Sequence, residues 1–197
     1  IDDRGGVISG GNGVQANLLG SGNATITVNG EIDAGANAGL IEQDTFTAGK
    51  TVALTVNDEA VGATRGADIS SYVPVTVTLG TDGRLEGEGS DGLRVIGSGN
   101  AATVTVAGSS GKIVGATNGM DLSTQGAAIT VSDLESVAGG KGEGIRARSN
   151  GGVITIENIG KITSQGDISI DADARGSSGG GGGDISIQNI TIGKIVD

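Results

Sequence analysis

Seven short segments of the chain alternate apolar residues with threonine or serine. In the first of them, Ile26 and Val28 alternate with Thr25 and Thr27. This period of two predicts a β-strand with one buried and one exposed face. The segments are Ala24–Val28, Val52–Val56, Val75–Leu79, Ala102–Val106, Ala128–Val131, Val153–Ile156 and Asp184–Ile187. Their ends lie 28, 23, 27, 25, 25 and 31 residues apart, which indicates a repeat of about 25 residues.

Each repeat contains two further strand-like patches. The second patch follows each of these segments, and its centres are Ile32, Val61, Leu85, Ile113, Val137, Ile162 and Ile195. The third patch begins directly after a glycine, and these glycines are Gly13, Gly39, Gly66, Gly92, Gly119, Gly144 and Gly166. No stretch shows a sustained helical period, so the sequence predicts an all-β chain with three short strands in each repeat.

A short strand cannot bury its apolar face alone, but stacked copies of it can. We therefore expect a parallel β-helix of about seven rungs, formed by residues 1–197 as a single segment. The expected interior column is Ile26, Leu54, Val77, Val104, Ile129, Ile154 and Ile185. Glycine at the corners is expected to supply positive φ angles. The run Gly179–Gly183 lengthens one repeat and predicts a loop insertion near residues 176–183.

The composition excludes several classes of protein and several kinds of functional site. The chain has 40 glycines in 197 residues, one proline, and neither cysteine nor histidine. The low proline content excludes collagen, and 36% hydrophobic residues exclude a disordered linker. The lack of histidine excludes Ser-His-Asp triads, Cys-His pairs and His-ligated zinc. A net charge of −11 argues against nucleic acid as a partner, and no apolar run is long enough for membrane insertion.

The repeat resembles the passenger region of Gram-negative type V autotransporters, from Val7 to Val196. The shared features are a coil of about 25 residues, glycine and asparagine corners, an acidic surface, no cysteine and few aromatics. The resemblance implies a right-handed β-helix that is exported through a C-terminal outer-membrane barrel. The related two-partner secreted haemagglutinins share these features and remain an alternative. The chain opens at Ile1 without a methionine or signal peptide, so we expect a segment excised from a longer passenger.

One candidate site is a column of hydroxyl side chains on the outer surface. It is expected to contain Thr27, Thr55, Thr78, Thr105, Thr130, Thr155 and Ser186. A partial second rank contains Thr25, Thr76 and Thr103, with Ala53, Ala128, Val153 and Asp184 interrupting it. Such an array resembles that of ice-binding β-helices. The alternative, which we favour, is that threonine simply suits an exposed strand.

Three other features have a functional and a structural interpretation. Asp171 and Asp173, with Asp167, Arg146 and Arg148 nearby, could hold calcium or cleave a polysaccharide. The structural alternative for this cluster is a solvated acidic face.

The run Gly179–Gly183 before Asp184 is similar to one calcium-binding nonapeptide, although such rolls need tandem copies, and a flexible loop is the simpler interpretation. Phe46 and Tyr72 lie 26 residues apart, so they are expected close together on adjacent rungs. They would form a small apolar cluster or a recognition patch.

The leading hypothesis is a surface-displayed or secreted passenger segment of a Gram-negative bacterium that acts in adhesion, self-association or host interaction. Its expected partners are a host-cell surface or another copy of the chain. The alternatives are a polysaccharide lyase or phage-type depolymerase and an ice-binding β-helix. We expect no enzyme, and assign no catalytic, cofactor-binding or metal-binding residue.

Overall fold

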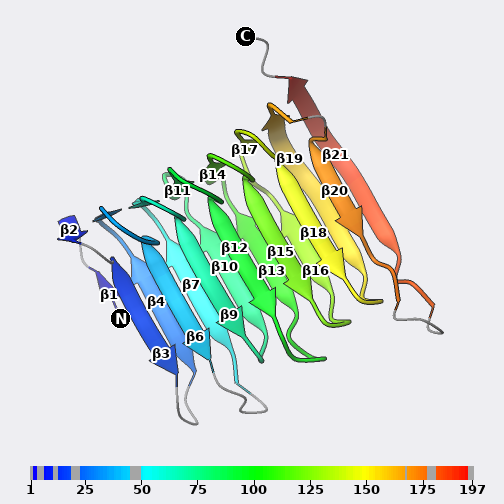
Figure 1. Cartoon of the computed structure of the whole chain (residues 1–197), viewed down its shortest axis with the longest axis horizontal. Helices are drawn as coiled ribbons and strands as arrows, with labels where there is room; N and C mark the ends of the chain where they lie inside the picture. The colour runs from blue at the N-terminus through cyan, green and yellow to red at the C-terminus, as the bar shows by residue number, and fades with distance from the viewer. Residues whose placement is uncertain are drawn as a thin grey trace.

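The chain coils into a parallel β-helix with three faces, and no residue that the structure describes lies in a helix. The computed structural model describes residues 2–3, 7–10, 13–18, 23–44, 50–166, 168–176 and 181–194. Within these ranges the strand pairs are parallel, and each strand pairs with the equivalent strand one turn away. The strands therefore lie side by side along the length of the molecule (Figure 1). Parallel β-helix architecture is confirmed.

The first and second faces belong to one 14-stranded sheet, and the third face is a separate sheet of seven strands. The first face contains β1 (Asp2–Asp3), β4 (Ala24–Val28), β7 (Val52–Val56), β10 (Val75–Leu79), β13 (Val104–Gly108) and β16 (Ile129–Ser132). The second face contains β2 (Val7–Gly10), β5 (Glu31–Ala34), β8 (Glu59–Gly62), β11 (Arg84–Gly87), β14 (Lys112–Gly115) and β17 (Ser136–Gly139). The third face contains β3 (Val14–Leu18), β6 (Leu40–Asp44), β9 (Ala67–Ser71), β12 (Leu93–Gly97), β15 (Met120–Thr124), β18 (Ile145–Ser149) and β20 (Ile170–Asp173).

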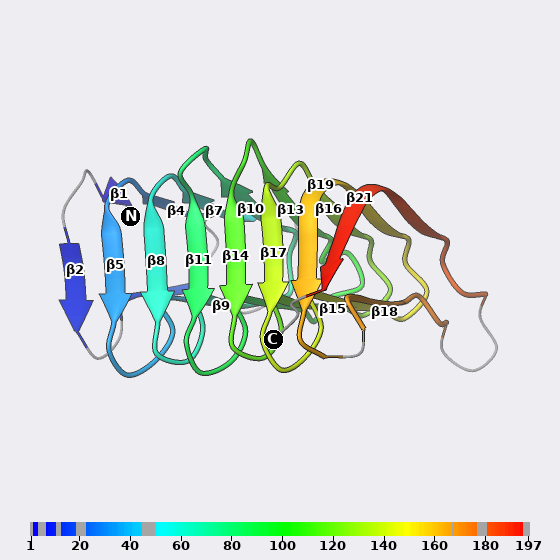
Figure 2. The same cartoon turned by 90° about the horizontal axis from the view of Figure 1, so that it is seen from above.

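Two long strands, β19 (Ile154–Ser164) and β21 (Ile185–Lys194), continue from the first face into the second. Figure 2 shows the second face with its strands in order from β2 to β21. Five regular turns, from β4–β6 to β16–β18, each supply three separate strands, so the expected count of about seven rungs is slightly too high. β20 begins at Ile170, later than the position directly after Gly166 that the sequence pattern predicts.

The interior is filled with aliphatic side chains. One cluster of buried residues extends from Ala24 to Ala174, and Leu85, Ile113 and Leu122 within it are fully shielded from solvent. Each such side chain stabilises the fold by about 1.5–3 kcal/mol relative to an exposed position. Packing of successive turns therefore holds the coil together.

The predicted interior column is wrong in its register. Ile26, Leu54 and Val77 align with Val106, whereas Val104 aligns with Val75 in the neighbouring column. The error came from aligning each segment on its last apolar residue. In β13 the last inward position is Gly108, and a side chain there would collide with Leu134, which fills the space.

The predicted centre of the second strand in β8 is displaced by one residue. Ala60, not Val61, aligns with Ile32 and Leu85 and is fully buried. Val61 lies on the outer side and is only partly buried. In the last turn, Ile192 aligns with Ile162, and the predicted centre Ile195 lies outside the described residues.

The glycines before the third-face strands are required by close backbone approach rather than by positive φ. A Cβ on Gly66 would lie 2.6 Å from the nitrogen of Glu86, and one on Gly119 would lie 2.5 Å from the oxygen of Gly144. Among the described glycines, positive φ occurs at Gly126 and Gly151. The expected role of glycine in tight corners is thus corrected to one of contact between adjacent turns.

The turn that contains β21 differs from the others in exposure. Ile185, Ile187 and Ile192 are 46%, 47% and 55% exposed, although their equivalents one turn earlier are buried. Residues 174–176 and 181–184, within and beside the predicted loop insertion, lie in no strand, and residues 177–180 are outside the described part. The described residues form no helix with the length and apolar character needed to cross a membrane.

Candidate interaction faces

The outward side chains of the first face form two interrupted ranks of mostly hydroxyl groups, in place of the continuous column that the sequence predicts. The two columns that the sequence pattern mixed are separate, and Thr105 aligns with Thr76 rather than with Thr78. The first rank is Thr25, Ala53, Thr76, Thr105, Thr130, Thr155 and Ser186. The second rank is Thr27, Thr55, Thr78, Ala107, Ser132, Glu157 and Gln188.

A third rank lies directly before the strands of the first face begin. Thr103, placed by the sequence pattern beside Thr25 and Thr76, belongs here. The backbone amide that follows each member donates to the carbonyl of the next member one turn along, as Val75, which follows Pro74, donates to the Thr103 carbonyl at 2.8 Å. The members are Asn23, Thr51, Pro74, Thr103, Ala128, Val153 and Asp184.

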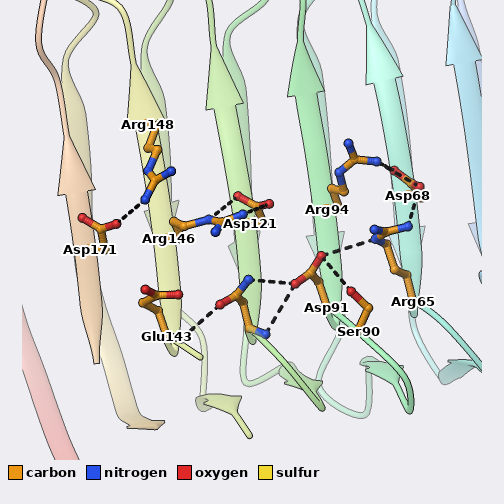
Figure 3. A network of polar contacts seen from close by, with 11 residues as sticks. Arg65, Asp68, Ser90, Asp91, Arg94, Asp121, Glu143, Arg146, Arg148 and Asp171 are labelled. Carbon is orange, nitrogen blue, oxygen red and sulfur yellow. Dashed lines mark hydrogen bonds and ion pairs between the residues drawn. The ribbon is translucent and has the colours of Figure 1, made fainter. Parts of the chain in front are cut away.

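The third face carries a column of alternating charge. Asp68, Arg94, Asp121, Arg146 and Asp171 are stacked in register on five successive strands. Figure 3 shows them as one line of side chains along this face. Arg94 lies 3.4 Å from Asp68, and Arg146 pairs with Asp121 through two hydrogen bonds. Hydrogen bonding to Asp121 raises the pKa of Arg146.

The carboxylates proposed for calcium or polysaccharide chemistry are paired with arginines. Asp171 accepts a hydrogen bond from Arg148 at 2.7 Å, and Asp173 pairs with Arg175. Hydrogen bonds from Arg175 lower the pKa of Asp173. These contacts make both carboxylates parts of ion pairs on the surface. Asp167 lies outside the described residues.

A buried polar network at the corner between the second and third faces was not predicted. Asp91 is only 4% exposed and accepts a hydrogen bond from the Asn118 side chain at 2.9 Å. It also accepts bonds from Arg65 and Ser90, while Asn118 accepts one from the Glu143 backbone (Figure 3). The network residues share a position in the repeat, directly before the glycine that precedes a third-face strand. They are Arg65, Asp91, Asn118 and Glu143. That spacing is the signal that could have revealed the network.

Asparagines connect turns at the corner between the first and second faces. The Asn57 amide donates to Asn29 at 2.7 Å, Asn158 donates to Asp133 at 3.2 Å, and Asn189 donates to Asn158 at 3.0 Å. Asp133, Asn158 and Asn189 have φ angles of 58°, 54° and 53°. Asparagine and aspartate tolerate this left-handed conformation better than most residues, so at this corner they take the role predicted for glycine.

A hydroxyl ladder lies inside the corner between the third and first faces. Thr124 and Ser149 are buried, their hydroxyl oxygens lie 3.0 Å apart, and each hydroxyl lies within hydrogen-bonding distance of the Ala127 carbonyl. Ser71 occupies the same column two turns earlier and bonds to Val73. These groups satisfy backbone atoms at a buried corner, as buried polar groups generally must.

The remaining candidate features are only partly described. Tyr72 is 44% exposed, but Phe46 lies outside the described residues, so their predicted contact stays a prediction. Of the glycine run, Gly181 to Gly183 are described, and the Gly183 amide donates to the Ala174 carbonyl at 2.8 Å. Within the described ranges, no three acidic side chains lie close enough together to hold a metal ion.

Comparisons with protein-family models, with curated proteins and with solved structures found no match to this chain. Its function therefore has to be inferred from the three outer faces and the corners between them.

Proposed function

We propose that the chain is a rigid binding scaffold on the surface of, or secreted by, a Gram-negative bacterium. It acts in adhesion, self-association or host interaction as part of an autotransporter or two-partner secreted passenger. The repeat style and the acidic, cysteine-free composition support this proposal.

The single observation that carries the proposal is that the interior is packed with apolar side chains while the outer faces carry regular polar arrays. Apolar residues fill the inside of the coil, and the charged side chains of the alternating column on the third face form ion pairs along the surface. What repeats on the outside is chemically different on each face. Such long, regular surfaces suit the binding of another macromolecule, because weak contacts add up along the stack.

The polysaccharide-cleaving alternative has less support. Its two central carboxylates, Asp171 and Asp173, are each held by an arginine. A general acid and base would need carboxylates that can exchange protons with a bound sugar. Incubation with acidic polysaccharides, followed by an assay for new reducing or unsaturated ends, tests this alternative directly.

The proposal is tested on the source bacterium with an antibody raised against residues 50–176. We expect labelling of intact cells or signal in the culture medium, and loss of that signal after brief protease treatment of intact cells. A deletion strain should adhere to host cells or to its own kind less than the parent strain. Signal that appears only after the cells are permeabilised would overturn the proposal.

A further inference from the structure

The first face is free of charge over five consecutive strands. In and directly before β4, β7, β10, β13 and β16, all fifteen positions of the three ranks are uncharged, and Ser132 among them is only 9% exposed. Nine of the fifteen are threonine. The positions are Asn23, Thr25, Thr27, Thr51, Ala53, Thr55, Pro74, Thr76, Thr78, Thr103, Thr105, Ala107, Ala128, Thr130 and Ser132.

Beyond these five strands the first face carries charge at Glu157 and Asp184, and Asp2 of β1 is in register with Thr27. The other charged side chains that the structure describes lie on the second and third faces and at the corners. The third face carries the alternating aspartates and arginines, and the second face carries pairs such as Lys112 with Glu135 at 3.0 Å. The whole chain has a net charge of −11, so two copies repel each other. Because Coulomb energy falls with distance, this repulsion is weakest when the copies meet at the face without charges.

The chemistry of the first face is complementary to itself. A threonine hydroxyl is both a donor and an acceptor, so one array can hydrogen-bond to an identical array. The methyl groups of the same threonines offer apolar contact beside each hydroxyl. Thr76 and Thr78 are exposed at the middle of this face and are in register with Ala53 and Thr55 of the next strand. The constant strand spacing of about 4.8 Å gives both copies the same repeat.

From this face we infer that two copies of the chain associate with their first faces in contact. The inference rests on the proposed function only in that it names the surface used for self-association. Five strands span about 19 Å along the stack, and the outer ranks lie about 13 Å apart. With side-chain margins this gives roughly 400–500 Å² per copy, compared with about 800 Å² in a standard interface. The contact is therefore weak, and becomes effective when many copies are displayed together.

Sedimentation equilibrium of the full chain at tens of micromolar to millimolar concentration tests the inference. Raising the salt from about 0.01 M to 1 M shortens the Debye length from about 30 Å to 3 Å. We expect the dissociation constant to fall several-fold, because salt screens the net repulsion and leaves an uncharged contact intact. An association that weakens as salt rises would place the contact on the charge column of the third face and overturn the inference.

Matched charge variants locate the contact. Thr76→Glu puts a carboxylate at the middle of the first face, and Ser70→Glu puts one on the third face, with the same change in net charge. We expect at least a tenfold larger dissociation constant for Thr76→Glu than for Ser70→Glu, with unchanged circular dichroism for both. Equal effects of the two variants would overturn the inference.

The lack of cysteine allows a measurement that does not depend on a destabilising variant. Spin labels on Thr105→Cys are expected to show a short distance between copies, and labels on Ser70→Cys a longer one. The opposite order would overturn the inference. A chain that stays monomeric throughout and shows thermal hysteresis would also overturn it, in favour of ordered water as the partner of this face. None of these outcomes changes where antibody labelling places the protein in the cell, so the proposed function is tested separately.

Discussion

Asp91→Ala tests whether the buried corner network holds adjacent turns together. The substitution removes the carboxylate that accepts hydrogen bonds from the Asn118 side chain at 2.9 Å and from Arg65 at 3.3 Å. A hydrogen bond to a charged group contributes about 1.5–3 kcal/mol, and Asn118 is only 3% exposed, so water replaces its partner poorly. Arg65 keeps Asp68, 3.2 Å away, which limits the loss on that side. We expect a decrease of about 2–4 kcal/mol in the free energy of unfolding.

Urea unfolding followed by far-ultraviolet circular dichroism measures this change. Asp82→Ala is the matched control, because Asp82 is exposed on a neighbouring corner and its loss should change stability by less than about 0.5 kcal/mol. Asp91→Asn keeps the shape and an acceptor oxygen, so it should lie between the two. Stacked repeats can open locally, so hydrogen exchange is measured as well.

The exchange experiment follows the Glu143 amide, which donates to Asn118 at 3.0 Å one turn further along. If Asp91 positions Asn118, this amide exchanges faster in Asp91→Ala and at the parent rate in Asp82→Ala. Equal stability of Asp91→Ala and Asp82→Ala, together with unchanged exchange at Glu143, would refute the reasoning.

Three further predictions use other parts of the coil. Ala60→Asp places an unpaired charge in the core and should abolish cooperative thermal unfolding. Val61→Asp places the charge on the outer side and should shift the melting curve little. Similar melting curves for the two variants would contradict the register of β8. Asn158→Ala should cost about 1–2 kcal/mol in urea unfolding because φ is 54°, and Asn158→Gly should cost less; the reverse order would contradict it. Arg175→Gln should raise the pKa of Asp173 towards the usual value near 3.9, measured by carboxyl NMR titration, and an unchanged midpoint would disprove the pairing. Because the folded-state pKa of Asp173 is lowered, the stability that this pair contributes is present at neutral pH and is lost as the pH falls through the acid range.

The fold could be predicted because burial of apolar side chains stabilises it, and apolar residues alternate with polar ones along each strand. Inward residues such as Ile26 and Leu85 had to be apolar, and glycines such as Gly66 and Gly119, directly before third-face strands, had to be small. Register was harder to predict. Gly108 carries no side chain to mark an inward position, and Leu134 fills the space from the next turn, so alignment on apolar residues slipped by two.

The candidate surfaces could be predicted only as types of residue. Threonines were recognised as outward-facing, but their grouping into ranks depended on the same register. Arg148 was expected near Asp171, but strand register aligns Asp171 with Arg146, so the bond that Arg148 donates to Asp171 was not predictable. The pairing of Asp173 with Arg175 was not predicted either. The Asp91 network was missed because polar residues beside glycine are also common at solvated turns.

The alternating column on the third face has a consequence for how the coil is assembled. Correct stacking places Arg94 between Asp68 and Asp121, so each turn added from β9 to β20 meets the opposite sign. If one turn were skipped, Asp68 would lie against Asp121, or Arg94 against Arg146, and like charges directly opposite destabilise a strand pair by up to about 1 kcal/mol. Repeat proteins are prone to such misassembly, because their turns are nearly interchangeable. The alternation of charge therefore favours the correct order of the turns, because a coil that lacks a single turn would bring like charges together.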